Sequence, residues 1–441
     1  MIEVEKMGKP AIPIVSGRFE GDAVASSRAF GMPDLKWVIV PRIYRNLAHD
    51  LCASQTVAAM DDIVKILTAS GDTSSRKTGP EPTSVERFEG DDRWDAVLRM
   101  NQEFMKRDLG DGFLLHPPTK QAVAALLKGT RLAADTVVCD MPPGFGIATV
   151  EKIAVNAALA GAKPEHMPVI IAAVKALSKV GGHGGKSLLM STSPNAPLLM
   201  VNGPIGKKVG LNPRSALGPG RDNEINIVIG RAFYLCLKNI GYWYPNQMDM
   251  DTIGTTRKFV MCVAENEAAS PWDPYHVDQG FKPNESAVTV FVTDGELDVQ
   301  DQGNTTGEGL LKNLAYGSTF GTRSIQDKGG GERLIFIPPD VAGPVGKTFT
   351  KKQAREFLHK HCYHSLGKLI QYMPLKGEAR VAKNWKWLEN LTEEQLLQIT
   401  VPVVDGPESF YLAVVGADRA KTAVFPSGPS PATVGIDQYL P

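Results

Sequence analysis

The short series of elements at the N-terminus constrains the fold more than any other feature. Residues 11–15 and 36–41 are apolar runs bounded by turn residues, and residues 21–30 between them have a helical pattern, which predicts strand, helix, strand. A second helix is predicted over residues 54–68. Residues 70–93 then contain Ser, Thr, Gly, Pro and charged residues with almost no apolar side chains, as a linker does.

Val57, Met60, Val64 and Leu67 recur at helical spacing in that second helix and predict one apolar face. We therefore divide the chain into a small, incomplete Rossmann-like α/β unit over residues 1–70, a linker over 71–93 and a large mixed α/β domain over 94–441. Two parallel strands and two helices offer too little sheet to cover both faces of an α/β layer. We expect either the larger domain or another polypeptide to complete it.

The remaining chain predicts a large mixed α/β domain. Helices are expected over residues 94–107, 117–127, 149–159, 164–177 and 223–240, and capping boxes start further helices near 351 and 393. Strands are expected over residues 136–139, 198–201, 259–263, 288–292, 334–337 and 410–415. No internal repeat is visible in the sequence.

Composition excludes several classes of function. Lys plus Arg and Asp plus Glu both number 48, so no global field attracts nucleic acid or an anionic membrane. The longest apolar stretch, residues 167–177, is too short for a span and contains Lys175. The N-terminus lacks the apolar core of a secretory signal, and the five cysteines are widely spaced without a Cys-x-x-Cys pair. A cytoplasmic protein with reduced thiols is expected.

Two glycine-rich loops are candidates for substrate binding. Residues 202–208 and 216–223 combine glycines, amides and cations before the helix near 223, and a helix N-terminus with Arg221 beside it can hold a carboxylate or phosphate. Turn chemistry alone also explains these glycines. A third loop before residue 149 lacks the last glycine of a dinucleotide fingerprint. The candidate substrate-binding residues are Asn202, Gly203, Gly218, Gly220, Arg221, Asn223, Gly144 and Gly146.

Residues 262–276 form the densest polar run after a predicted strand. Loops that follow strands are where α/β proteins place reacting groups. Glu265, Glu267 and His276 could act as acid, base or metal ligand, and Cys262 as a nucleophile if its thiolate is stabilised. A buried strand cysteine followed by a solvated loop is the alternative.

The other histidines and cysteines give weaker signals. Residues 359–364 (His-Lys-His-Cys-Tyr-His) resemble a metal cluster in composition, but only His361 and His364 share a helix face, so an exposed helix end is the simpler interpretation. His116 and His183 are isolated, Cys139 could be a core residue, and His49 and His166 carry no signal.

Several long motifs resemble the UGSC family of (seleno)proteins. They lie at residues 31–35 and 38–41, then at 143–156, 163–169, 198–204, 216–220 and 264–272. The family is named after a motif of selenocysteine or cysteine followed by Gly, Ser and Cys. In relatives this motif lies upstream of a segment similar to residues 5–15, and Cys-Gly-Ser-Cys occurs nowhere in this sequence.

The resemblance therefore implies that a small second subunit carries the thiol or selenol motif and completes the N-terminal sheet, which would make the protein an oligomer. A truncated gene, with a selenocysteine codon interpreted as a stop, is the rival explanation.

Three functions follow as hypotheses. The first is the large subunit of a heteromeric enzyme in which the partner's thiol or selenol cleaves a bond in a small organic substrate. The second is a hydrolase, hydratase or lyase that uses Glu265, Glu267 and His276, with Cys262 or a metal ion left open. The third is a non-catalytic binding subunit.

Overall fold

The computed structural model describes residues 4–5, 8–29, 32, 34–41, 49–69, 85–182, 189–319, 331–365, 367, 390–428 and 430–441. The chain forms two compact units. The smaller unit comprises Met1–Pro80, Pro245–Met250 and His364–Val401, and the larger unit comprises Glu81–Tyr244, Asp251–Tyr363 and Pro402–Pro441. The α/β class predicted from the sequence is confirmed.

The smaller unit contains the predicted strand–helix–strand series. Strand β1 (Ile14–Ser16) pairs in parallel with β2 (Val38–Val40), and α2 (Glu20–Ala29) lies between them in the sequence. Helices α3 (His49–Ala58) and α4 (Met60–Thr68) follow, and α17 (Glu393–Gln398) also belongs to this unit. Among the described residues of this unit, the parallel pair of β1 and β2 does not by itself define a Rossmann-like sheet, so that part of the prediction is not confirmed.

The apolar face predicted for residues 54–68 is exposed to solvent. Val57, Met60, Val64 and Leu67 are 72%, 44%, 50% and 36% exposed. Ala59, Ile63 and Ile66 instead pack in a small core with Val38, Val40 and Ile12. The single helix predicted over residues 54–68 is divided at Ala59 into the end of α3 and α4. The two helices carry apolar residues on two faces, and the strand pair covers only one of them.

The larger unit begins with helices and a hairpin. They are α5 (Arg93–Lys106), α6 (Lys120–Leu127), β3 (Val137–Met141), β4 (Gly146–Thr149), α7 (Val150–Leu159) and α8 (Met167–Leu177). Asp92, Thr119 and Thr149 cap α5, α6 and α7 through their side chains, as N-cap residues do. Helix α8 is almost wholly buried, which explains its continuous apolar sequence.

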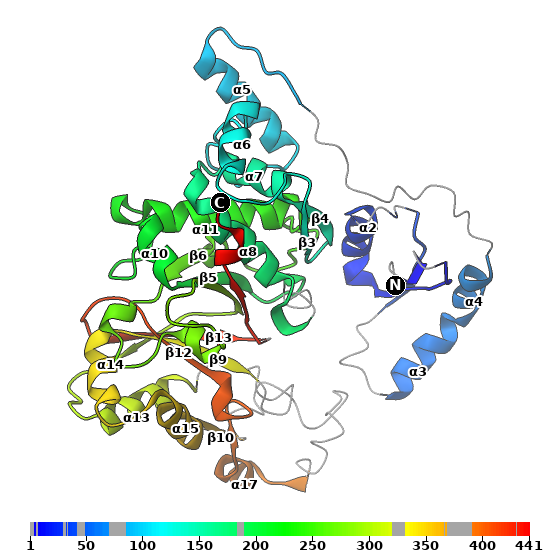
Figure 1. Cartoon of the computed structure of the whole chain (residues 1–441). Helices are drawn as coiled ribbons and strands as arrows, with labels where there is room; N and C mark the ends of the chain where they lie inside the picture. Colours follow the sequence, from blue (N-terminus) through cyan, green and yellow to red (C-terminus); the bar gives the residue numbers. More distant parts are fainter. Residues whose placement is uncertain are drawn as a thin grey trace. The chain divides into compact units, whose positions relative to one another are not determined.

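A mixed eight-stranded sheet forms the centre of this unit (Figure 1). Its strands are β5 (Ala196–Asn202), β6 (Met261–Ala264), β7 (Ala287–Thr293), β8 (Leu297–Gln300), β9 (Glu332–Ile337), β12 (Phe410–Val414), β13 (Lys421–Ser427) and β14 (Ala432–Gly435). The main order is β12-β9-β13-β7-β5-β6, with β14 on β7 and β8 on β13. The separate strands β10 (Tyr363–Ser365) and β11 (Thr400–Pro402) form a two-stranded sheet.

The order of the main sheet shows two halves with the same topology. In the first half β5 runs parallel to β6 and antiparallel to β7, and in the second half β9 runs parallel to β12 and antiparallel to β13. Each half has one further strand, which pairs with the other half. Strand β8, which follows β7, pairs with β13, and β14, which follows β13, pairs with β7. The internal repeat that the sequence does not reveal is therefore present in the topology.

Helices connect the parallel strands in both halves. Helices α10 (Pro204–Val209) and α11 (Glu224–Asn239) lie between β5 and β6, and α14 (Pro339–Gly346) and α15 (Lys351–His361) lie between β9 and β12. Helix α13 (Gly307–Gly317) packs with α14 and α15 over one core cluster (Figure 1). A second cluster, which includes Leu198, Phe291, Leu334 and Phe425, gathers side chains from both halves of the sheet.

The two edge strands of the main order meet at their carboxyl ends. The Asn266 N–H donates to the Val414 carbonyl at 2.7 Å, although β6 and β12 stand at opposite ends of the strand order. The sheet must therefore curl, which brings the ends of β5, β6 and β12 to one place.

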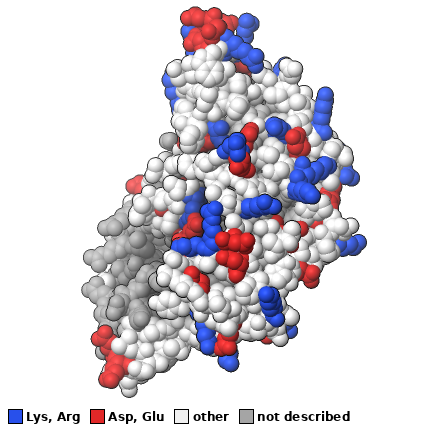
Figure 2. Space-filling model, turned by 90° about the vertical axis from the view of Figure 1, so that its left-hand side faces the viewer, with Lys and Arg blue, Asp and Glu red and all other residues white. Residues whose placement is uncertain are grey.

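The surface carries no large field of one sign on the face drawn in Figure 2, where basic and acidic side chains are interspersed among neutral ones. This agrees with the equal counts of the two charge types. Within the described parts of the chain, we find no helix whose length and hydropathy would let it cross a membrane.

Candidate functional site

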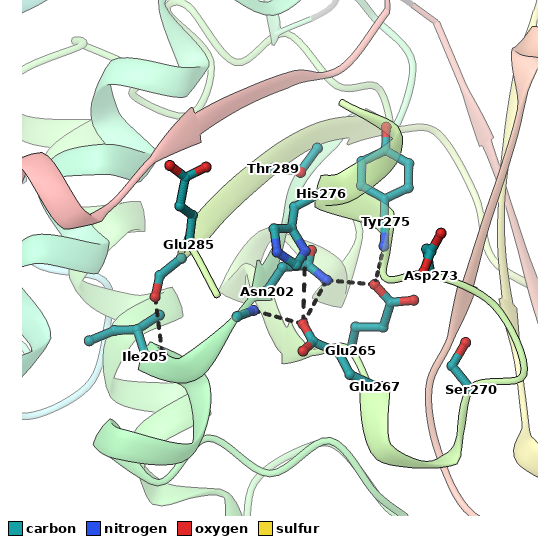
Figure 3. A network of polar contacts seen from close by, with 12 residues as sticks. Asn202, Ile205, Glu265, Glu267, Ser270, Asp273, Tyr275, His276, Glu285 and Thr289 are labelled. Carbon is teal, nitrogen blue, oxygen red and sulfur yellow. Dashed lines mark hydrogen bonds and ion pairs between the residues drawn. The ribbon is translucent and has the colours of Figure 1, made fainter. Parts of the chain in front are cut away.

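Polar side chains from separate elements converge at the carboxyl ends of β5 and β6 (Figure 3). Asn202 is the last residue of β5, and Glu265 directly follows β6. Because these strands are adjacent and parallel, their carboxyl ends share one edge of the sheet. Glu267 lies in the short turn that follows, and His276 lies in α12 (Tyr275–Asp278).

The Asn202 amide joins the two carboxylates. Its Nδ2 group donates to Glu265 Oε2 at 2.5 Å and to Glu267 Oε1 at 3.2 Å. The Gly203 N–H donates to the same Glu267 oxygen at 2.7 Å. Gly203 has a φ of 82°, and a Cβ there would lie 2.2 Å from the Glu285 carbonyl oxygen, so only glycine fits this turn.

Glu265 is a buried carboxylate with several hydrogen-bond donors. Besides Asn202, the Tyr275 N–H donates to Oε2 at 2.7 Å and the Val414 N–H to Oε1 at 3.4 Å. Burial raises the pKa of Glu265 to about 7, although the nearby charge of Lys351 and the hydrogen bonds from Tyr275 and Asn202 lower it. Glu265 therefore changes its protonation near neutral pH.

Lys351, in α15, supplies the cation beside this carboxylate. Its side chain is only 8% exposed, and its Nζ donates to the Asp273 carbonyl at 2.6 Å and to Asp278 Oδ2 at 2.9 Å. A helix from the second half of the sheet thus sets the charge environment of a residue in the first half.

His276 is fully buried, and its environment defines its tautomer. Its Nε2 lies 3.2 Å from the Lys282 carbonyl, which can only accept, so Nε2 carries a proton. Its Nδ1 lies 4.0 Å from Glu267 Oε1 and has no hydrogen-bond partner. A proton added at Nδ1 would face the Glu267 carboxylate.

Cys262, the predicted nucleophile, lies in the buried part of β6. It is 3% exposed, and burial raises the pKa of its thiol to about 12. Its thiolate is therefore scarce at neutral pH, which opposes a nucleophilic role. Burial likewise raises the pKa of Cys139 to about 11 and that of Cys362 to about 12.

The glycine turn before α11 makes contacts of its own. The Arg221 side chain is 91% exposed and pairs with Asp222 at 2.8 Å, and a Cβ at Gly218 or Gly220 would meet open space. Asn223 is buried and donates to the Ala216 carbonyl at 2.6 Å. Among the described residues, no hydrogen bond connects Arg221 to the cluster around Asn202.

Gly144 and Gly146 face a neighbouring backbone. The Gly144 N–H donates to the Gly241 carbonyl at 2.8 Å, and a Cβ at Gly146 would lie 2.0 Å from the Ile240 carbonyl oxygen. Close packing of the hairpin against residues 240–242 is sufficient to explain both glycines.

The histidines after residue 358 do not form a metal centre within the described chain. In those parts no group of three or more His, Cys, Asp or Glu side chains is arranged to hold a metal ion. The His361 ring packs on Phe357 at 4.2 Å, and Cys362 is buried. His183 lies outside the described residues.

Sequence reasoning missed three contributors to the site. Tyr275 and Val414 act through backbone N–H groups, which leave no signal in side-chain chemistry. Lys351 was visible only as the first residue of a capped helix. Its place beside Glu265 depends on how α15 and β6 pack, which no local pattern shows.

These contacts define an α/β protein with a cluster of two carboxylates, an amide and an imidazole at the carboxyl ends of two parallel strands. The model of the UGSC family matches residues 1–69, which confirms the resemblance inferred from the motifs for that segment. No curated protein matches the chain.

Proposed function

We propose that the larger unit catalyses proton transfer on a small polar molecule, as a hydrolase, hydratase or lyase that needs no redox step. The observation that carries this proposal is that Glu265 and Glu267 share one amide, that of Asn202, while His276 Nδ1 lies 4.0 Å from Glu267 Oε1. Paired carboxylates beside an imidazole are the groups from which general acid–base sites are built.

Glu267 is the group that exchanges protons with the substrate. Its side chain is 29% exposed, the largest exposure among the three acid–base residues, and two donors fix the orientation of Oε1. It takes a proton from water or, in an elimination, from the substrate carbon, whose electron pair then forms a double bond as the leaving group departs. In hydrolysis or hydration, the hydroxide then adds to the electrophilic carbon, and the proton passes to the leaving group or to the neighbouring carbon.

His276 and Glu265 support this transfer from buried positions. The His276 imidazole presents Nδ1 toward Glu267, because the Lys282 carbonyl keeps the proton on Nε2. Glu265 positions Asn202 and, with its pKa of about 7, tunes the charge that Glu267 meets. Both are positioning residues in this mechanism.

Glu267→Gln tests the role of the base. A substrate would first be identified by incubating the purified protein with amides, esters and unsaturated acids and detecting products by mass spectrometry. The substitution is expected to lower kcat by about 10²–10⁴-fold, the usual contribution of a general base. Glu308→Gln, at an exposed carboxylate paired with Lys312, is the matched control and should retain full activity. Undiminished turnover in Glu267→Gln would refute the proposal.

A heteromeric enzyme with a partner-borne thiol or selenol is the second candidate. It is supported by the UGSC match over residues 1–69 and by the exposed apolar side chains of Val57, Met60, Val64 and Leu67. Exposed apolar faces of this kind are typical of surfaces that bind a second polypeptide. Reductive cleavage on this partner would draw its two electrons from an external thiol.

Val64→Glu tests this association, with Lys65→Glu on the same helix as control. Native mass spectrometry of protein purified from its source should show a small Cys- or Sec-containing subunit that is lost in the first variant and kept in the second. A monodisperse single chain that is fully active would exclude the heteromer.

A further inference from the structure

The acid–base site contains more hydrogen-bond acceptors than donors. The acceptors are the Glu265 and Glu267 carboxylates, Asn202 Oδ1 and His276 Nδ1. The side-chain and backbone donors that reach them are the Asn202 amide and the N–H groups of Gly203, Tyr275 and Val414. All these donors are directed at the carboxylates.

Two acceptors are left without a partner. Asn202 Oδ1 and His276 Nδ1 are buried atoms with no hydrogen bond, and their residues are 1% and 0% exposed. Each unpaired buried acceptor costs about 1–3 kcal/mol. They cannot satisfy each other, because the Lys282 carbonyl holds the imidazole proton on Nε2 and leaves Nδ1 as an acceptor.

Rotation of the Asn202 amide does not solve the problem. A flipped amide would place Oδ1 where Nδ2 now donates to both carboxylates, at 2.5 Å and 3.2 Å. Glu267 Oε1 would then face an oxygen in place of a donor, and Glu265 could pair with that oxygen only in its protonated form. The orientation with Oδ1 free is the one that the carboxylates impose.

The neighbouring cation does not supply the missing donors. Lys351 Nζ is held by the Asp273 carbonyl and by Asp278, and no hydrogen bond connects it to Asn202 or His276 in the described chain. The site therefore combines unfilled acceptors with the negative charge of Glu267.

We propose that the substrate of this site carries a cationic nitrogen group with at least two N–H donors, such as a primary ammonium or an amidinium. One N–H is donated to Asn202 Oδ1 and another to His276 Nδ1, while Glu267 compensates the positive charge. An anionic group would be repelled from the same place. This inference rests on the proposed acid–base function and names its substrate class.

Titration of the full-length protein with simple cations tests the inference. The probes are acetamidinium and methylammonium, with tetramethylammonium as the cation without N–H donors and acetate as the anion. The reporter is the nitrogen-15 resonance of His276 Nδ1 in histidine-labelled protein, assigned by its absence in His276→Gln. Acetamidinium and methylammonium should shift this resonance saturably, and tetramethylammonium should bind at least about tenfold more weakly.

Equal responses to methylammonium and tetramethylammonium would show that charge alone is recognised and would overturn the inference. A preference for acetate, or no response to any probe, would overturn it as well. Asn202→Ser, which keeps a small polar side chain, should weaken acetamidinium binding, whereas Asn313→Ser, at a distant amide on α13, should not.

The test separates this inference from the proposed function. The titration needs no turnover, so a missing response with activity that still depends on Glu267 refutes only the substrate class. A clear response with turnover that is indifferent to Glu267→Gln refutes only the acid–base role.

Discussion

The two halves of the main sheet differ most at the carboxyl ends of their parallel strands. Ala196 and Glu332 pair with Thr293 and Ser427, which in turn pair with each other between β7 and β13. Counting six residues onward from each makes Asn202 equivalent to Pro338. By the same register, Glu265 is equivalent to Val415, and both donate their N–H to the neighbouring strand at 3.1 Å, to Val201 and Ile337.

Equivalent backbone positions thus hold a carboxylate in one half and a valine in the other. Val415 is 6% exposed and packs in the cluster shared by both halves, and Glu265 is 5% exposed at the matching place. The valine shows that this position needs no polar group to form the fold. Burying a carboxylate costs several kcal/mol unless it is well hydrogen-bonded, and three donors satisfy Glu265 where Val415 needs none, so the first half buries a polar group that this backbone position does not require.

Asn202→Val should have the largest effect on this contrast. It removes the one amide that donates to both carboxylates, and we expect a loss of about 3 kcal/mol in the free energy of unfolding together with most of the activity. Denaturant titration and turnover assays measure the two effects. Asn313→Val, which removes an amide bonded to Asp301 outside the site, should cost less than about 1 kcal/mol.

If Asn202→Val were as stable as the parent protein, the polar hydrogen bonds at the end of the first half would add nothing to the free energy of unfolding. The polar end of the first half and the apolar end of the second would then not differ in their contribution to stability.

The pH dependence of stability should show the difference between Glu265 and Val415. The pKa of Glu265 is raised from 4.5 to about 7, so the folded state binds an extra proton between these values. Its contribution to stability is complete below pH 4.5 and is lost as the pH rises through 7, by about 3 kcal/mol in total. Unfolding measurements across this range should show the decline.

Glu265→Gln should flatten that decline, because the titrating group is gone. Glu308→Gln, at an exposed carboxylate, should leave the slope as it is in the parent protein. A slope that persists in Glu265→Gln would assign the titration to another group.

The sequence predicted where the candidate site lies better than it predicted the hydrogen bonds within it. The short apolar runs marked where β5 and β6 end, so Asn202 and Glu265 could be expected at a strand edge. The partners of Glu265 could not be expected, because two of them are backbone N–H groups, and that of Val414 comes close only when the sheet curls.

The repeat was hidden for a related physical reason. Equivalent positions such as 202 and 338 share backbone geometry but differ in side-chain type, so they leave no similarity in the sequence. The apolar spacing from Val57 to Leu67 predicted one apolar face but not its burial, because periodicity cannot tell a face that packs from a face that stays exposed.

Gly203→Ala should have an intermediate effect at the end of the first half. A Cβ would meet the Glu285 carbonyl oxygen at 2.2 Å in a backbone conformation with φ of 82°, and we expect a loss of about 2 kcal/mol. Gly218→Ala, with open space around its Cβ, should change stability by less than about 0.5 kcal/mol. Thermal unfolding of both variants would measure the difference, and equal losses would contradict the close approach at Gly203.

Arg221→Ala should have the smallest effect on the comparison between the halves. The guanidinium is 91% exposed and its partner Asp222 is also on the surface, so its removal should change stability by less than about 0.5 kcal/mol. The turn was predicted from the sequence to hold an anionic substrate group, and the same variant tests that prediction through KM. A KM raised about tenfold with unchanged kcat would place the turn in substrate binding beside the acid–base site. An unchanged KM would confine recognition to the ends of β5 and β6, where the first half differs from the second.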